Sequence, residues 1–449
     1  MEISMSRRKF LKRTSLSTAG IALSLGSGRS QNGNLVQNAD QPAILGGTPV
    51  RAEQFPSWPI YEDHDVELYL DAYASKRWSE YSNRDTERVV EFEKKYAELM
   101  GTKFCAATNA GTTALTAALS VVGVGPGDEV IVPTNTFIAT AQAVFNLFAL
   151  AVFVDSDPET FMINTELIEE KINERTKAIL PVHIGGGAVN MDRIMDISRK
   201  YQIPVIEDVC QAHMGEWRNK KLGSVGHLGC FSFQAGKSLT CGEGGAIIGD
   251  DETLMDRCHA YKNNGRVPGG RGIYPGSNYR MTPFQVAVVM GQMMRLEEQS
   301  KRRDENAAYL EELIKDIPGI SPCKKYAGQT RRAYYGYGLI YNQKEFDGLP
   351  RRKFTEAIRA EGIGFGSGCD TLNKDEFVQV YLNLRPFQTL FSKERIAQYW
   401  EENHCPVNDQ IDEETGLTLG QRIFLGTKKD MEDIAEAIVK IRNHATELI

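Results

Sequence analysis

The chain has 449 residues, of which 41% are hydrophobic and 25% are charged, and its formal net charge is −7. This length exceeds what one simple core usually organises, so we expect a large domain with a smaller one beside it. The acidic balance gives no reason to expect nucleic acid as a partner, and no stretch reaches the ~18 apolar residues of a confident membrane span.

The amino-terminal region has the pattern of a targeting segment. The run S-R-R-K-F-L-K from Ser6 to Lys12 precedes a mildly apolar stretch, Thr14 to Leu25, that is rich in Ser, Ala and Gly. Paired arginines before a short apolar region resemble a bacterial twin-arginine signal, and the alternative is a disordered basic tail. We expect export to the periplasm or beyond, with or without cleavage; if the signal is not used, the protein stays in the cytoplasm. Residues 1–40 are therefore assigned to a signal and linker.

Strand-like and helix-like segments alternate from about residue 85 to 250. Apolar runs predict strands at 104–107, 129–133, 151–155, 178–182, 204–208, 228–233 and 245–248. Helical spacing predicts helices at 86–100, 111–122, 139–150 and 192–201. Buried strands separated by helices indicate an α/β fold with a mostly parallel sheet. In such sheets, ligands bind beyond the carboxyl ends of the strands.

A long helical stretch, Pro283 through Tyr309, follows and links this part of the chain to the rest. After about residue 310 the pattern becomes α+β, with one strand and two helices at Tyr334–Tyr341, Arg351–Glu361 and Lys429–Arg442. The sequence thus predicts a large domain over residues 41–300 and a smaller C-terminal domain over residues 301–449.

Lys237 is the most informative residue of the chain. It lies between an apolar strand-like run and a glycine-rich turn, and Asp208 ends an earlier predicted strand. Pyridoxal phosphate needs from a protein a lysine that bonds its aldehyde and an acid that protonates its pyridine nitrogen. We expect Lys237 to move the proton between the substrate Cα and the cofactor. We expect Asp208 to keep the pyridine nitrogen protonated.

Other segments of the sequence offer groups for the phosphate and the ring of this cofactor. Gly111 and Thr112 begin a predicted helix, whose N-terminus can bind a phosphate. Ser232 offers a hydroxyl, and Phe137 follows a predicted strand, where its ring could stack on the cofactor. Each signal alone has an ordinary structural explanation, such as a helix start or a core aromatic residue. The complete set in one context favours a cofactor site.

Histidines and cysteines add little to this site. His183 is either a substrate contact or a structural histidine, and the same alternatives stay open for His213. The eight cysteines form no C-x-x-C pair, and several lie in apolar strand-like runs. Buried free thiols therefore fit better than disulfides, and no metal site is predicted.

The motifs resemble those of the DegT/DnrJ/StrS family of sugar aminotransferases, which have the type I fold of aspartate aminotransferase. The likeness runs from about residue 43 to the C-terminus. Six blocks carry it in order: Gly125–Pro133, Thr176–His183, Val205–His213, Phe231–Lys237, Gly242–Gly245 and Asn278–Met281. More narrowly, Ile44–Arg51 and Trp58–Ile60 resemble the branch of scyllo-inosose and aminohydroxybenzoate-type enzymes.

The resemblance implies a role for each residue at a matching position. The cofactor-binding set that it implies is Gly111, Thr112, Phe137, Asp208, Gln211, Ser232, Lys237 and Asn278. In the family, the residue at Gln211 lies near the cofactor ring and its 3′-oxygen. The residue at Asn278 reaches the phosphate site of the neighbouring subunit, which implies a homodimer as the minimal active unit. Family dehydratases carry a histidine at the position of Lys237, so the lysine favours transamination.

We therefore predict a pyridoxal-phosphate-dependent aminotransferase that moves an amino group from glutamate or glutamine to a keto-sugar or keto-cyclitol. One alternative is a dehydratase or lyase reaction at the same site, and another is a non-catalytic sugar-binding relative. Gly236 stands before Lys237 where the family commonly has a hydroxyl residue, which could loosen the loop. The export signal also departs from a family that meets nucleotide-linked sugars in the cytoplasm. No arginine is assigned to the donor carboxylate.

Overall fold

The computed structural model describes residues 39–80, 87–266, 274–368 and 370–449. Residues Ala39–Ile449 form one unit, and the predicted export signal lies outside the described residues. In the part of the chain that is described, no helix is long and apolar enough to cross a membrane. Seven described cysteines are free thiols.

A mostly parallel sheet of seven strands lies at the centre of the first two-thirds of this unit. Its strands are β1 Phe104–Thr108, β2 Glu129–Pro133, β3 Leu150–Val154, β4 Thr176–Ile179, β5 Ile206–Asp208, β8 Leu228–Ser232 and β9 Gly245–Gly249. One part has the order β3-β2-β4 and the other β5-β8-β9-β1. Two isolated parallel bridges, Ile179 to Val205 and Val182 to Asp208, join the two parts. Among these strands, β9 is the one that runs in the opposite direction, antiparallel to both β1 and β8. The other pairs are parallel, so the predicted fold class is confirmed.

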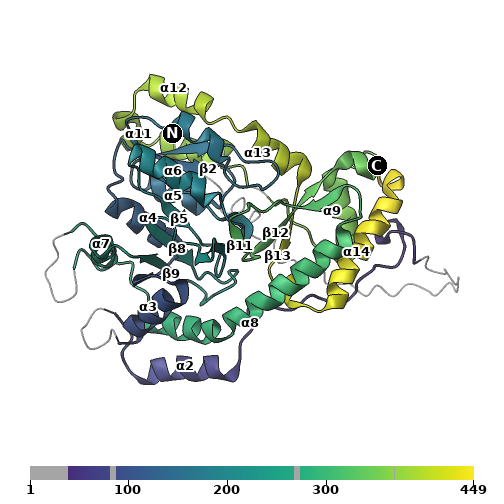
Figure 1. Cartoon of the computed structure of the whole chain (residues 1–449), viewed down its shortest axis with the longest axis horizontal. Coiled ribbons are helices and arrows are strands. Elements are labelled where there is room, and N and C mark those ends of the chain that lie inside the picture. The colour runs from purple at the N-terminus through teal and green to yellow at the C-terminus, as the bar shows by residue number, and fades with distance from the viewer. Residues whose placement is uncertain (1–38, 81–86, 267–273, 369) are drawn as a thin grey trace, which may run out of the picture. The chain divides into compact units, whose positions relative to one another are not determined.

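Helices cover both faces of this sheet (Figure 1). On one face lie α3 Glu87–Met100, α6 Met191–Tyr201 and the start of α8 Pro283–Ile314. On the other lie α4 Gly111–Val121, α5 Ile138–Phe145 and α7 Glu252–Lys262. Side chains alternate along each strand, so Ile131 faces the first group while Val130 and Val132 face the second.

A second core forms around a three-stranded antiparallel sheet. Its strands are β10 Ile320–Pro322, β12 Gly336–Tyr341 and β13 Gly416–Gly420, and β12 lies between the other two. The helices α9 Arg351–Ala360 and α14 Lys428–Asn443 pack on it together with the end of α8. The helix α8 therefore contributes to both cores, and Figure 1 shows it running between them. The domain boundary at residue 300 stays a prediction.

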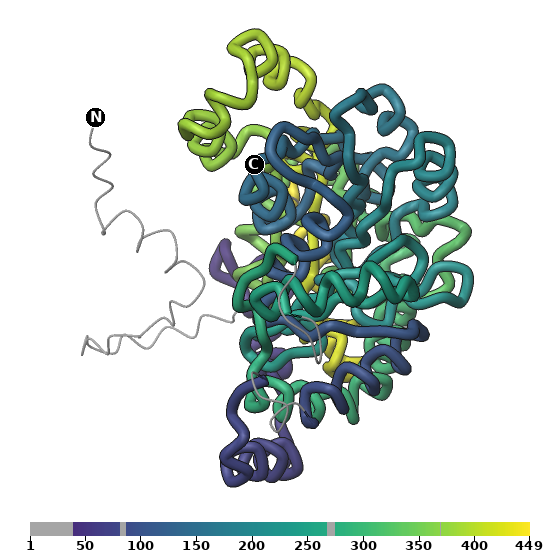
Figure 2. The backbone as a smooth tube through the Cα atoms, turned by 90° about the vertical axis from the view of Figure 1, so that its left-hand side faces the viewer, coloured from purple at the N-terminus to yellow at the C-terminus, as the bar shows by residue number. Residues whose placement is uncertain are grey.

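Three regions carry helices that the sequence pattern did not predict, and α7 on the central sheet is the first of them. The helix α2 Asp63–Ala74 packs against α8. Four short helices follow β12 in sequence, α10 Glu376–Leu382, α11 Arg385–Leu390, α12 Lys393–Glu402 and α13 Pro406–Gln410. Phe387 and Tyr399 of this segment belong to the core around β2, β3 and α5. Figure 2 shows the segment in yellow-green beside the early strands and helices in blue.

The segment that carries α12 covers the edge strand β3. Tyr399 donates a hydrogen bond from Oη to the carbonyl oxygen of Ala151 at 2.8 Å. The backbone N–H of Phe153 donates to the side-chain oxygen of Asn403. An edge strand otherwise presents unpaired N–H and C=O groups to other chains. The two side chains therefore satisfy backbone groups that the sheet leaves open.

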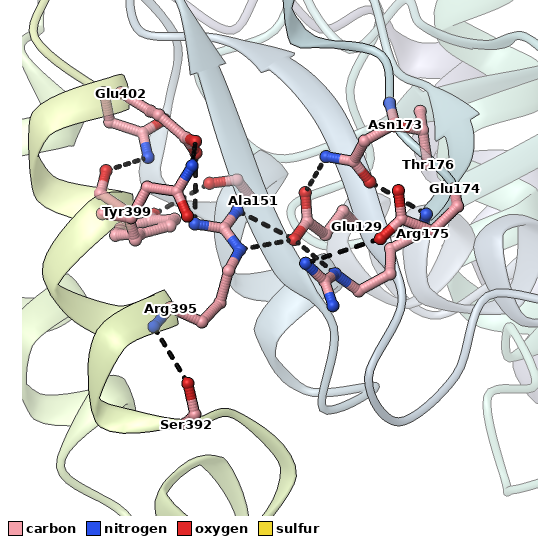
Figure 3. Close-up of polar contacts among 12 residues, drawn as sticks. Glu129, Ala151, Asn173, Glu174, Arg175, Thr176, Ser392, Arg395, Tyr399 and Glu402 are labelled. Carbon is pink, nitrogen blue, oxygen red and sulfur yellow. Dashed lines mark hydrogen bonds and ion pairs between the residues drawn. The ribbon is translucent and has the colours of Figure 1, made fainter.

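A buried carboxylate also fixes α12 to the sheet. Glu129 at the start of β2 is fully buried, and Arg395 of α12 donates to its Oε1 from Nη2 at 2.8 Å and from Nε at 3.0 Å. Arg175 and Asn173 donate to the same carboxylate at 3.2 and 2.9 Å (Figure 3). A carboxylate at this depth is tolerated because cations and donors compensate its lost hydration.

We predict that Arg395→Ala destabilises the fold by about 3 kcal/mol, because it leaves the buried Glu129 short of its main partner. Urea denaturation measures this change. Arg352→Ala serves as the matched control, since Arg352 forms an exposed ion pair with Glu356. That change stays within about 0.5 kcal/mol. Equal midpoints for the two variants would contradict the assignment.

Candidate active site

A cavity of about 430 Å³ lies at the carboxyl ends of β5 and β8. Seven residues of the predicted set line it: Gly111, Thr112, Phe137, Asp208, Gln211, Ser232 and Lys237. They come from the start of α4, the residue before α5, the ends of β5 and β8, and the loops that follow these two strands. The structure thus brings together residues from four separate stretches of sequence, 111–112, 137, 208–211 and 232–237.

Asp208 is the last residue of β5 and is almost completely buried. Thr140 of α5 donates from Oγ1 to its Oδ2 at 2.8 Å, and the backbone N–H of Cys210 donates to its Oδ1 at 3.1 Å. Both oxygens therefore have a fixed partner, which sets the direction of the carboxylate in the cavity. Neither Thr140 nor Cys210 was predicted from the sequence, because no short motif indicates a contact with Asp208.

Lys237 lies in the loop after β8, and only 9% of it is exposed. Its Nζ lies 4.4 Å from the centre of the Tyr335 ring. Its backbone N–H donates to the carbonyl oxygen of Gln234 at 2.8 Å, and the N–H of Gly236 donates to the side-chain oxygen of Gln234 at the same distance. The glycine before Lys237 is therefore part of a hydrogen-bonded turn.

The start of α4 has the features of an anion site. Its N-cap residue Ala110 makes no side-chain hydrogen bond to the first turn, so the N-terminal N–H groups keep their capacity to donate. A Cβ on Gly111 would lie 2.7 Å from the Cβ of Ser232. Only glycine therefore lets this helix end approach the strand end. The hydroxyls of Thr112 and Ser232 line the same cavity.

Phe137 and Gln211 line the cavity in different ways. Phe137 precedes α5, and 57% of it is exposed although it lies on a cavity wall. An aromatic side chain in this position can stack on a planar ligand. Gln211 accepts a hydrogen bond at Oε1 from the backbone N–H of Gly185 at 2.8 Å, which holds its side chain in place.

His183 is not among the residues that line this cavity. His183 is fully buried, and its Nε2 lies 3.0 Å from Oε2 of Glu207. Its Nδ1 accepts from the backbone N–H of Val189 at 3.2 Å, so Nε2 carries the proton and donates to Glu207. Both ring nitrogens are engaged, and the structure gives His183 a role in packing.

His213 likewise has both ring nitrogens engaged. Its Nε2 lies 2.9 Å from the carbonyl oxygen of Ser232, and its Nδ1 lies 3.2 Å from Oη of Tyr96. Burial lowers the pKa of His213 to about 4. At neutral pH the imidazole is therefore uncharged, and it fixes the end of β8 from behind the cavity.

Asn278 lies outside the lining of this cavity. Its backbone forms an isolated bridge with Asn263, and the carbonyl oxygen of the next residue, Tyr279, accepts from the N–H of Asn109 at 2.8 Å. The side chain of Asn278 is exposed. It is thus held beside the start of α4 without entering the cavity of its own chain.

A second cavity of about 500 Å³ shares Gln211 and Tyr335 with the first. Residues from both cores line it, and those with polar or aromatic side chains include Trp58, Asn135, Asp370, Thr418, Gln421 and Arg422. Trp58 donates from Nε1 to the carbonyl oxygen of Ala235 at 3.0 Å, two residues from Lys237. Sequence reasoning missed this cavity, because no short motif joins residues so far apart.

The first cavity fits pyridoxal phosphate. It offers a buried lysine, a buried and oriented carboxylate, and a helix N-terminus with two hydroxyls at a place where a side chain larger than glycine would clash. These groups match the aldehyde, the pyridine nitrogen and the phosphate of that cofactor. Within the described residues, no cluster of His, Cys, Asp or Glu could hold a metal ion.

Comparisons with known proteins agree with this geometry. The profile of the DegT/DnrJ/EryC1/StrS aminotransferase family matches residues 64–377. A putative L-glutamine:3-amino-2,3-dideoxy-scyllo-inosose aminotransferase of Streptoalloteichus tenebrarius is 31% identical over 90% of this chain and 99% of its own. The L-glutamine:scyllo-inosose aminotransferase of Streptomyces griseus is 32% identical over 90% and 98%.

A solved structure, that of 3-amino-5-hydroxybenzoic acid synthase, superimposes with a TM-score of 0.75. It is 30% identical and covers 86% of this chain and 98% of its own. The order of the motifs, the cavity that they line and the length of these matches all point to the same family. The chain therefore belongs to the DegT/DnrJ/EryC1/StrS aminotransferase family, as its motifs predicted.

Proposed function

We propose that this chain transfers the amino group of L-glutamine to a free keto-cyclitol, with pyridoxal phosphate as its cofactor. The observation that carries the proposal is the placement of Lys237, Asp208 and the start of α4 around one cavity, with a second cavity beside it. The relatives that match along nearly their whole length are named for L-glutamine and for inosose acceptors, which supports this choice of substrates.

The residues of the first cavity would hold the cofactor by its three polar groups. Gly111, Thr112 and Ser232 lie where they can bind the phosphate. Asp208 would hold a proton at the pyridine nitrogen, and Phe137 would stack on the ring. When bound, pyridoxal phosphate supplies an aldehyde that takes up an amino group and a ring that withdraws electrons from the substrate Cα.

Lys237 has the position of the proton carrier. Its Nζ is buried in the same cavity as Asp208 and lies against the ring of Tyr335. From there the amine can take a proton from the Cα of the donor and return one to the carbon of the acceptor. Burial also keeps bulk water away from the reacting atoms.

The second cavity has the polarity expected for a polyhydroxylated ring. Asn135, Thr418 and Gln421, which have amide or hydroxyl side chains, are among the residues that line it. The donor and the acceptor react in turn with the cofactor, so both molecules would use this cavity successively. The cavity adjoins the one that contains Lys237, which agrees with such alternating use.

The first test is an absorbance spectrum of the protein with pyridoxal phosphate, before and after L-glutamine is added. We expect the yellow colour to bleach as the cofactor accepts the amino group, and a keto-cyclitol such as scyllo-inosose to restore it. Lys237→Ala should retain the cofactor but react about 10²–10⁴-fold more slowly. A yellow protein that no amino acid bleaches would favour a dehydratase or lyase reaction.

We also propose that the active unit is a homodimer in which Asn278 serves the cavity of the partner. Support comes from the exposed position of Asn278 beside the start of α4. In addition, Tyr69, Tyr73 and Trp78 are exposed, and their rings form a continuous group with Phe284. An exposed aromatic group of this kind is typical of a protein interface.

Mixing two inactive variants tests this arrangement. Asn278→Ala and Lys237→Ala subunits, unfolded and refolded together, should recover activity, because each mixed dimer then contains one site with both native residues. Each variant refolded alone is the control and stays inactive. No recovery, although co-purification through different affinity tags on the two variants shows mixed dimers, would place Asn278 in its own subunit's site or outside any site.

We further propose that residues 6–25 direct export through the twin-arginine route. The support is the sequence pattern around Arg7 and Arg8, and a route that carries folded proteins suits an enzyme loaded with its cofactor in the cytoplasm. Cell fractionation tests the proposal: the native chain should reach the periplasm, and the Arg7→Lys, Arg8→Lys double variant should stay in the cytoplasm. The proposal would be refuted if the native chain and the double variant had the same distribution between periplasm and cytoplasm.

A further inference from the structure

Arg422 is a cationic residue at the wall of the second cavity. It follows β13, is exposed, and is one of the residues that line the cavity. Across residues 39–80, 87–266, 274–368 and 370–449, no ion pair or hydrogen bond engages its guanidinium. An arginine that lines a cavity in this state can bind an anion with two parallel hydrogen bonds.

The neighbouring residue Gln421 adds a hydrogen-bond donor to the same wall. Gln421 is another of the residues that line the cavity and is almost completely buried. Nη2 of Arg303 donates to its Oε1, and its backbone N–H donates to the carbonyl oxygen of Tyr335 at 3.1 Å. Arginine can only donate, so the amide oxygen of Gln421 must face Arg303. The NH₂ group of Gln421 is then the part that is left to face a ligand.

Arg303 lies directly behind this wall, on α8. Only 1% of it is exposed, and its Cζ lies 5.5 Å from the centre of the Trp58 ring. In the part of the chain that the structure describes, its Nε and Nη1 have no hydrogen-bond partner. Burial lowers the pKa of Arg303 to about 9, which leaves it protonated at pH 7. A buried cation is costly for the fold unless an ion pair compensates its lost hydration, and among the described residues Arg303 forms none within 4 Å. Its field adds to that of Arg422 in the second cavity.

We propose that Arg422 and the amide of Gln421 bind the α-carboxylate of the amino donor, with Arg303 as the residue that positions Gln421. This inference deepens the proposed function and rests on it for the identity of the donor. Of the two substrates, only the amino acid carries a carboxylate, and an uncharged cyclitol requires no cation. The subsite places the donor where its amino group can reach the cavity of Lys237.

The charges of the cavity favour a carboxylate over a phosphate or a nucleotide. Among its described lining residues, Arg422 is the cationic one and Asp370 is an acidic one. A nucleotide diphosphate carries at least two negative charges, and sites for such groups typically gather several cations or backbone N–H groups. One arginine, one amide and a nearby carboxylate match a single small anionic group.

The first experiment measures each half-reaction separately, in the complete protein with its cofactor. In Arg422→Gln, the L-glutamine concentration that gives half-maximal bleaching should rise at least tenfold. The return of the colour with scyllo-inosose should stay within twofold of the native rate. Arg352→Gln, an exposed arginine on α9, is the matched control and should change neither. An unchanged glutamine dependence in Arg422→Gln overturns the proposal, as does a loss confined to the acceptor step.

The second experiment uses binding instead of turnover. Calorimetry with glutarate, a dicarboxylate without an amino group, should show a dissociation constant at least tenfold weaker for Arg422→Gln than for the native protein. Gln421→Glu pairs a carboxylate with Arg303, so we expect this variant to keep the native melting temperature. Its negative charge should weaken glutarate binding at least as much as Arg422→Gln does. Gln421→Met carries no charge that would repel a carboxylate, so it should weaken glutarate binding less than Gln421→Glu does.

These results separate the subsite from the reaction. If L-glutamine does not bleach the native protein but glutarate binding depends on Arg422, the proposed donor is wrong and the carboxylate subsite stands. If L-glutamine bleaches the native protein while glutarate binds Arg422→Gln equally well, the subsite is refuted and the reaction stands. Inorganic phosphate that binds through Arg422 more tightly than glutarate would assign the subsite to a phosphate and overturn the proposal.

Discussion

The carboxylate of Glu207 holds the two parts of the sheet together at the point where the site forms. It is fully buried and accepts hydrogen bonds from Nε2 of His183 on one side and from three backbone N–H groups in the loop 223–226 on the other. Because side chains alternate along β5, the neighbouring Asp208 then faces the cavity. The strand end that would meet the cofactor is thus fixed by the residue next to it.

Local signals in the sequence were sufficient for the central sheet and for the first cavity. Runs of buried aliphatic residues such as those of β2 and β3 identify strands that are covered on both faces. Lys237 and Gly111 stand next to glycine-rich or helix-starting turns, which short motifs describe well. Since such turns follow the carboxyl ends of parallel strands, their order in the sequence predicted their gathering in space.

The parts that could not be predicted depend on contacts between distant residues. The helices α10 to α13 are 5–10 residues long, too short for a helical period to stand out, and packing on β3 and α5 stabilises them. The sequence leaves His183 open between a substrate contact and a structural histidine, and only the structure shows Glu207 beside it. Arg303 and Gln421 are more than a hundred residues apart, and nothing in either local pattern indicates their pairing.

The segment between Gly366 and Gln410 both covers the edge strand β3 and supplies part of the wall of the second cavity. With the second cavity as the proposed substrate site, substrate choice and solubility therefore depend on the same piece of chain. A substitution that reshapes this wall for a new acceptor also disturbs the cover, and an uncovered edge strand pairs with other molecules. Variants with altered acceptor preference should consequently also tend to aggregate. A second substitution that restores the cover of β3 would then be needed to restore their solubility.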